Sequence, residues 1–147
     1  MESRLEYDKE APGAYKAFLG LETYLHHSSL EASLLELVKM RASMINGCAY
    51  CLDMHSKDAR AKGESEQRLY GLSAWRETPY YTERERAALA YADTMTRDIA
   101  VPDDVFAEVK RHFNTREIVE LTVLVGSYNM NARVVQALQL DLEPVTP

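Results

Sequence analysis

The chain has 147 residues, 46% of them hydrophobic, so we expect one domain, spanning residues 1–147, with a core of its own. Lysine and arginine together number 17 against 23 acidic residues, and the net charge of −6 disfavours binding to nucleic acids or to anionic membrane surfaces. The first ten residues are too polar for a signal peptide, and no run reaches the roughly 18 apolar residues of a membrane span, so we expect a cytoplasmic protein.

Two helices are predicted in the first third of the chain, because hydrophobic residues recur three and four positions apart. The first helix follows Pro12 and Gly13, and Glu22 is the one polar residue on its apolar stripe. The second is predicted to begin at a capping box, in which the side chains of Ser28 and Glu31 each satisfy a backbone N–H. Apolar residues cover much of the circumference of this second helix, which places it at the centre of the core.

Two further helices are predicted in the middle of the chain. The Asn-Gly pair at positions 46–47 breaks the second helix. With the asparagine as N-cap, a third helix is predicted over residues 47–62, and Gly63 is its expected stop. A fourth helix is predicted to begin near Ser65 and to end at Thr78–Pro79.

The last third of the chain predicts three more helices. Residues 82–85 form a second capping box, Pro102 is predicted as the first residue of a short helix, and residues 114–117 form a third box. The helix that follows this third box is predicted to extend to Leu138. Residues 121–125 contain enough β-branched residues to form a strand instead. The sum is an all-α domain, a bundle of six or seven helices.

The residues with the clearest chemical meaning are Cys48, Cys51 and His55, which a helix would place on one stripe. Cysteines three apart on a helix need only a modest adjustment to form a disulfide. Two thiols beside an imidazole are the minimal equipment for dithiol–disulfide chemistry. The alternatives are two small buried residues without chemistry, or a zinc site, for which this stripe supplies at most three of the four ligands.

The position of the helix start favours Cys48 as the more reactive thiol. Backbone N–H groups and the helix dipole stabilise a thiolate in the first turn. A free thiol has a pKa near 8.5, so a lowered pKa is what makes such a cysteine a nucleophile. An imidazole four residues after Cys51 could instead take the proton from that thiol.

A longer pattern surrounds the cysteines: Glu36, eleven residues, Cys48-x-x-Cys51, three residues and His55, with Arg41-x-Ser43-x-x-Asn46 between them. This pattern resembles the core of the alkylhydroperoxidase D-like (AhpD-like) proteins of the carboxymuconolactone decarboxylase superfamily. The helical layout and the chain length are compatible with the small single-domain members of that superfamily.

The resemblance implies a peroxidase that uses no cofactor and no metal. It assigns Cys51 as the thiol that attacks the peroxide, Cys48 as the thiol that resolves it to a Cys48–Cys51 disulfide, and His55 with Glu36 as a proton relay. It implies hydrogen peroxide or an organic hydroperoxide as substrate and an external dithiol, lipoyl-bearing or thioredoxin-like, as reductant. It also implies a homo-oligomer, either a dimer, a trimer or a hexamer. We follow the resemblance in choosing Cys51 as the attacking thiol.

Several residues near the motif have more than one interpretation. Glu36 has Lys39 three residues on, as in a surface ion pair, but it also lies among leucines, where burial would raise its pKa. Arg41 is expected to pair with a carboxylate. Tyr50 stands between the cysteines, where some members of the family have a relay histidine, and we expect it to bind substrate or to gate the pocket. Residues 128–133 resemble the last helix of the family and are assigned to packing or subunit contact.

Three functions therefore compete. The first is thiol-dependent reduction of hydroperoxides. The second is lactone decarboxylation, the activity that names the superfamily, but that branch generally lacks the cysteine pair. The third is a non-catalytic redox sensor or scaffold whose disulfide changes a partner interface.

Overall fold

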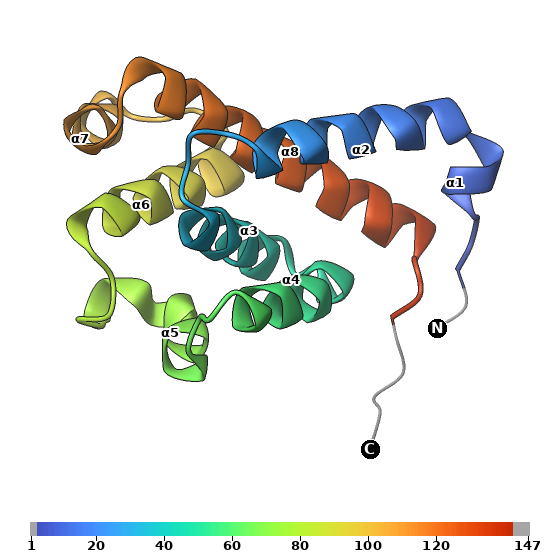
Figure 1. Ribbon diagram of the computed structural model, residues 1–147, viewed down its shortest axis with the longest axis horizontal. Coiled ribbons are helices and arrows are strands. Elements are labelled where there is room, and N and C mark those ends of the chain that lie inside the picture. Colours follow the sequence, from blue (N-terminus) through green and yellow to red (C-terminus); the bar gives the residue numbers. More distant parts are fainter. Residues whose placement is uncertain (1–2, 143–147) are drawn as a thin grey trace.

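The computed structural model describes residues 3–142, and Figure 1 shows that they form a bundle of helices. In chain order the elements are α1 (Tyr7–Glu10), α2 (Pro12–His26), α3 (Ala32–Asn46), α4 (Ala49–Ala61), α5 (Glu66–Gly71), the 3-10 helix η1 (Leu72–Glu77), α6 (Glu83–Asp98), α7 (Asp103–His112) and α8 (Thr115–Leu138). The all-α prediction is confirmed, with eight α-helices and no strand in the described residues instead of six or seven helices. None of these helices is long and apolar enough to span a bilayer.

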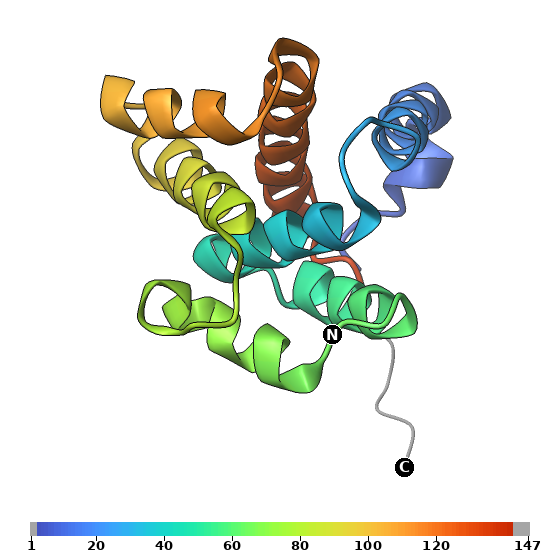
Figure 2. The ribbon, with the colours of Figure 1, turned by 60° about the vertical axis from the view of Figure 1, so that its left-hand side comes forward.

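Helix α3 lies at the centre of the bundle, with α4, α6 and α8 packed around it (Figures 1 and 2). Every residue from 34 to 43 is buried. Leu35 and Val38 join a core shared with α6 and α8, while Leu37 and Met40 join a second cluster with α4, η1 and α6. The predicted central helix is confirmed. Because α3 is buried on all sides, its polar residues must find their partners inside the protein.

Two of the three predicted capping boxes are present. At the start of α6, Glu85 N–H donates to Thr82 Oγ1 at 3.2 Å and Thr82 N–H donates to the Glu85 carboxylate at 2.8 Å. Asn114 and Glu117 form the same pair of bonds at the start of α8, at 3.0 and 2.8 Å. Ser65 caps α5, as predicted. Each cap satisfies backbone groups that a helix start leaves without partners.

The third box, at Ser28 and Glu31, was predicted wrongly. Helix α3 begins at Ala32, and no side chain caps it. Its approach loop is bound to α8 instead, because the N–H of Ser29 donates to the carboxylate of Glu120 at 2.9 Å and its hydroxyl donates to the same oxygen. Glu120 is only 1% exposed, and a carboxylate buried so deeply requires donors. This demand sets the path of the loop.

Helix α8 ends at Leu138, as predicted, and residues 121–125 lie within it, so the strand alternative is wrong. Pro102 is the N-cap of α7 and not its first residue, one position from the prediction. After α8 the chain turns, and Arg4 N–H donates to Leu138 O at 2.8 Å. The first described residues therefore lie beside the end of α8.

The predicted carboxylate partner of Arg41 is Asp93 on α6. The guanidinium binds it through Nε at 2.5 Å and Nη2 at 3.1 Å, and both residues are buried. Nη1 donates to the backbone carbonyls of Leu72 and Ser73 at 3.2 Å each. These bonds connect the central helix α3 to the start of the 3-10 helix η1.

Candidate active site

The junction between α3 and α4 positions the two cysteines. Asn46 is the last residue of α3 and Gly47 ends that helix with φ +63°, so the predicted N-cap at Asn46 is wrong. The left-handed glycine turns the chain before a new helix can begin. Cys48 is therefore the N-cap of α4, and its Sγ accepts the N–H of Cys51 at 3.3 Å.

Cys48 and Cys51 are joined by a disulfide, with their Cα atoms 5.3 Å apart. Both side chains are fully buried. The side chains packed around the disulfide are apolar or aromatic and come from α4, α8 and the turn after α8: Tyr50, Ala132, Val135 and Leu140. Three of these, Tyr50, Val135 and Leu140, also line the neighbouring cavity. A layer one side chain thick therefore separates the disulfide from that cavity.

The cavity has a volume of about 680 Å³ and is bounded by α1 and α2 on one side and by α3, α4 and α8 on the other. Ligand pockets for small organic molecules span about 300–1,000 Å³. The wall contributed by α1 and α2 combines four aromatic or aliphatic side chains, Tyr7, Tyr15, Phe18 and Leu19, with polar residues that include Asp8, Glu22 and Thr23. His26 and His27 are exposed, as predicted, and line the cavity from the end of α2.

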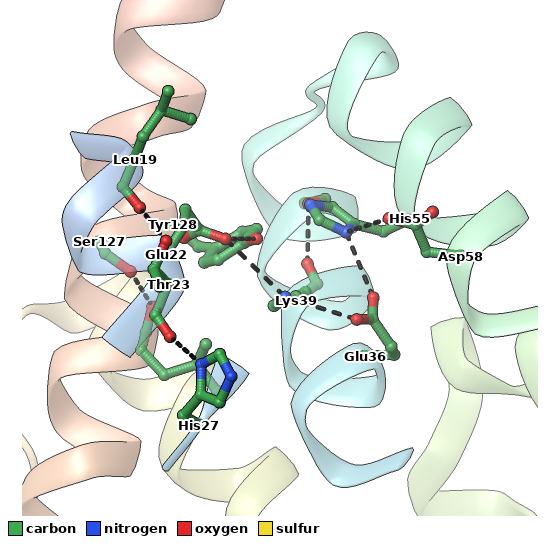
Figure 3. Close-up of polar contacts among 12 residues, drawn as sticks. Leu19, Glu22, Thr23, His27, Glu36, Lys39, His55, Asp58, Ser127 and Tyr128 are labelled. Atoms are coloured by element: carbon green, nitrogen blue, oxygen red, sulfur yellow. Dashed lines mark hydrogen bonds and ion pairs between the residues drawn. The ribbon is translucent and has the colours of Figure 1, made fainter. Parts of the chain in front are cut away.

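His55 and Glu36 meet in the wall of this cavity (Figure 3). Nδ1 of His55 lies 3.3 Å from Oε2 of Glu36, and each residue is only 2% exposed. Beside an ionised carboxylate Nδ1 carries the proton, which leaves Nε2 with a lone pair. Nε2 is buried, and none of the described residues gives it a hydrogen-bond partner. This nitrogen can therefore accept a proton from a group brought next to it.

Two lysines complete the surroundings of Glu36. Nζ of Lys62 lies 2.6 Å from Glu36 Oε1, and Nζ of Lys39 lies 3.4 Å from the same oxygen. Lys39 is only 7% exposed, so the alternative of an ordinary surface ion pair is wrong.

The pKa of Glu36 departs from the expected direction. Burial by itself would raise it, but hydrogen bonds from His55 and Lys62 and the charge of Lys39 together lower the pKa from 4.5 to about 2. Glu36 is therefore ionised at neutral pH.

Tyr128 joins this network from α8. Its ring meets the His55 ring edge-on, with centroids 4.9 Å apart, and its hydroxyl donates to Glu22 Oε2 at 2.8 Å. Nζ of Lys39 lies 3.9 Å from the same Glu22 oxygen (Figure 3). Burial, reinforced by Glu22, raises the pKa of Tyr128, so its hydroxyl stays protonated. Residues 128–133 were assigned to packing or subunit contact, but Tyr128 contributes to the candidate site.

The sequence contained signals for Lys62 and Glu22, two residues of the site that the motif did not include. Lys62 lies seven residues after His55 and eleven after Cys51, on the same stripe of α4. Glu22 was already noted as the one polar residue on the apolar stripe of α2. Both signals are weak without the fold, because charged residues at helical spacing are usually solvated.

The donor atoms of Glu36, His55 and Asp58 lie within 4.8 Å of one another, a spacing at which three ligands can share a metal ion. The chemistry of the group does not fit one, because the ammonium groups of Lys39 and Lys62 already neutralise the Glu36 carboxylate. Asp58 is about half exposed and lies 4.0 Å from His55 Nδ1.

Comparison with known proteins identifies what the chain is similar to. The model of the carboxymuconolactone decarboxylase family matches residues 11–94. The uncharacterized protein YdfG of Bacillus subtilis (strain 168) is 38% identical over 91% of this chain and 92% of its own length. The crystal structure of ATU0492 from Agrobacterium tumefaciens, a protein of unknown function whose name links it to AhpD and antioxidant defence, is 43% identical. It superimposes with a TM-score of 0.93 over 99% of this chain and 100% of its own.

A more distant structure extends the same comparison. An uncharacterized peroxidase-related protein from Silicibacter sp. TM1040 is 27% identical, with a TM-score of 0.80 over 88% of this chain and 70% of its own.

Proposed function

Because the chain belongs to the carboxymuconolactone decarboxylase family, as an AhpD-like member, we propose that it is a thiol-dependent peroxidase working through a Cys48–Cys51 dithiol/disulfide cycle. The observation that carries the proposal is the bonded cysteine pair at the start of α4, one helical turn before a buried histidine–carboxylate pair that lines a cavity. A thiol peroxidase needs these three parts: a reactive thiol, a resolving thiol and a base.

In the proposed cycle the base is Nε2 of His55. Glu36 holds the Nδ1–H, so the lone pair of the neutral imidazole is on Nε2. Nε2 takes the proton of the Cys51 thiol, and the imidazolium that results is stabilised by the ionised Glu36. Glu36 therefore acts as an electrostatic partner of His55 and stays ionised throughout, rather than receiving the proton as the second member of a relay.

The thiolate of Cys51 then attacks the terminal oxygen of the hydroperoxide, and the O–O bond breaks. The S–O bond forms, the leaving alkoxide takes the proton from His55, and Cys51 becomes a sulfenic acid. The thiol of Cys48 attacks the sulfenic sulfur, the disulfide forms and water leaves. An external dithiol, lipoyl-bearing or thioredoxin-like, restores both thiols and is itself oxidised.

The volume of the cavity and its aromatic and aliphatic side chains, Tyr7, Tyr15, Phe18 and Leu19, support an organic hydroperoxide as well as hydrogen peroxide as substrate. Tyr50 packs against the disulfide and lines the cavity, which supports the role of a gate between the substrate and the sulfur atoms.

The test is peroxide consumption by the pre-reduced wild type, Cys51→Ser and Cys48→Ser after removal of the reductant, followed by turnover of the wild type with an excess of a dithiol. Cys51→Ser should show no reaction, while Cys48→Ser should consume about one equivalent and stop as a sulfenic acid, detected by mass spectrometry. The reverse pattern would assign the attack to Cys48. A wild type that forms the disulfide without turnover would indicate a redox sensor, and lactone decarboxylation that survives both changes would indicate the other branch of the family.

A further inference from the structure

We infer that Lys62 is a positioning residue that holds the Glu36 carboxylate toward His55 and thereby sets the pH range in which His55 can act as a base. The inference rests on the proposed function, since it concerns the same base. It assigns a role to a residue that contacts neither the sulfur atoms nor the imidazole in the observed interactions.

The geometry of the end of α4 brings Lys62 to this position. The helix ends at Ala61, Lys62 is its C-cap, and Gly63 follows with φ +93°. The chain leaves the helix at the glycine, while the Lys62 side chain reaches Glu36 on α3 with a short Nζ–Oε1 distance of 2.6 Å. The other oxygen of the same carboxylate faces His55 Nδ1 at 3.3 Å. Lys62 and His55 therefore hold the carboxylate from its two sides.

A second, smaller cavity of about 320 Å³ lies on the other side of Glu36. It is lined by residues of α3, the end of α4 and the segment from Gly63 to Arg68. Glu36 and Lys62 are the two residues that line both this cavity and the one of about 680 Å³. The ion pair therefore forms the partition between them. The Lys62 side chain is 33% exposed, whereas Glu36 is only 2% exposed, so Lys62 shields the carboxylate on its outer side.

The charged groups around Glu36 determine the effect of removing Lys62. Helix α3 contributes Lys39, α4 contributes His55 and Asp58, and α2 contributes Glu22. From α8 comes the hydroxyl of Tyr128, which stays neutral.

Arg68 also lines the smaller cavity, but its guanidinium is bound by the carboxylates of Glu64 and Glu85. Among the described residues, removing Lys62 would leave Lys39 as the one ammonium paired with Glu36, and Lys39 also pairs with Glu22, while Asp58 lies 4.0 Å from His55 Nδ1. The local potential would become more negative, which stabilises the imidazolium form of His55 and opposes the thiolate form of Cys51.

In Lys62→Met the pKa of His55 should rise, so His55 stays protonated up to a higher pH and cannot accept the thiol proton there. The acidic limb of the kcat/KM profile should move upward by roughly one pH unit. A purely structural role would lower kcat/KM by the same factor at every pH and leave the limb where it is. Lys62→Arg keeps the charge and a donor and should restore the wild-type limb.

The experiment measures kcat/KM for hydrogen peroxide against pH, with saturating dithiol, in the wild type, Lys62→Met, Lys62→Arg and Lys57→Met. Lys57 is a matched control, because it lies on the same helix, is about half exposed and pairs with Asp53 at 2.8 Å. The pKa of His55 is followed separately by proton NMR of its ring, which requires no turnover.

An upward move of both the acidic limb and the His55 pKa in Lys62→Met, absent from Lys62→Arg and Lys57→Met, supports the inference. An unchanged His55 pKa in Lys62→Met overturns it. If the wild type shows no turnover but the His55 pKa moves as expected, the proposed function fails while the role of Lys62 stands.

Discussion

The buried carboxylate of Glu36 should make a large and pH-dependent contribution to stability. Its pKa falls from 4.5 in an unfolded chain to about 2 in the folded protein, and a tenfold change in proton affinity is worth about 1.4 kcal/mol. The ionised carboxylate therefore stabilises the folded state by about 3 kcal/mol at pH 7. Glu36→Gln replaces it with a neutral group of the same shape, so the free energy of unfolding should fall by about that amount.

The pH dependence of this contribution has a definite sign. Because the pKa of Glu36 is lower in the folded protein, its contribution is complete above the unfolded pKa of 4.5 and is lost as the pH falls toward 2. The stability difference between wild type and Glu36→Gln should therefore shrink from about 3 kcal/mol at pH 7 to about 2 kcal/mol at pH 3.5.

The assay is urea unfolding of the disulfide-bonded proteins, followed by far-ultraviolet circular dichroism at pH 7, 5 and 3.5. Glu77→Gln is the control, since Glu77 is an exposed carboxylate, and it should change the free energy of unfolding by less than about 0.5 kcal/mol. A difference between wild type and Glu36→Gln that stays below about 1 kcal/mol at pH 7, or that does not shrink in acid, would refute the account of Glu36 as a carboxylate held ionised by its partners.

Three further changes test other parts of the molecule. Tyr50→Ala thins the cover over the disulfide, so reduction by dithiothreitol, followed by quenched alkylation, should be several-fold faster; an unchanged rate would show that Tyr50 is no barrier. Asp93→Ala leaves the guanidinium of Arg41 buried without its carboxylate and should cost about 3–5 kcal/mol in urea unfolding, and a cost below about 1 kcal/mol would contradict this. Gly63→Ala imposes the φ of +93° on a residue with a side chain and should cost roughly 1–2 kcal/mol. Gly13→Ala, which also meets no neighbouring atom but has helical backbone, should cost nothing in the same titration.

Local features of the sequence were enough to predict the helices and the chemistry of the motif. The periodicity of apolar residues predicts α2 through α8, and the boxes at Thr82 and Asn114 mark helix starts because they involve residues only three apart. The spacing of Cys48 and Cys51 predicts that they can bond, since one helical turn sets the distance between them. Such interactions depend on neighbours in the chain, and a sequence records those directly.

The differences from prediction at the start of α3, at Glu36 and at Tyr128 come from contact between residues far apart in the chain. Ser29 binds Glu120, and α3 begins at Ala32 instead of directly after the predicted cap at Ser28. Lys62 binds Glu36, and the carboxylate that burial should have made a weak acid becomes a strong one.

Tyr128 likewise comes within reach of His55 only through the packing of α8 against α3 and α4. In each case the free energy of satisfying a buried polar group outweighs the local preference, and only the folded chain shows which distant group satisfies it.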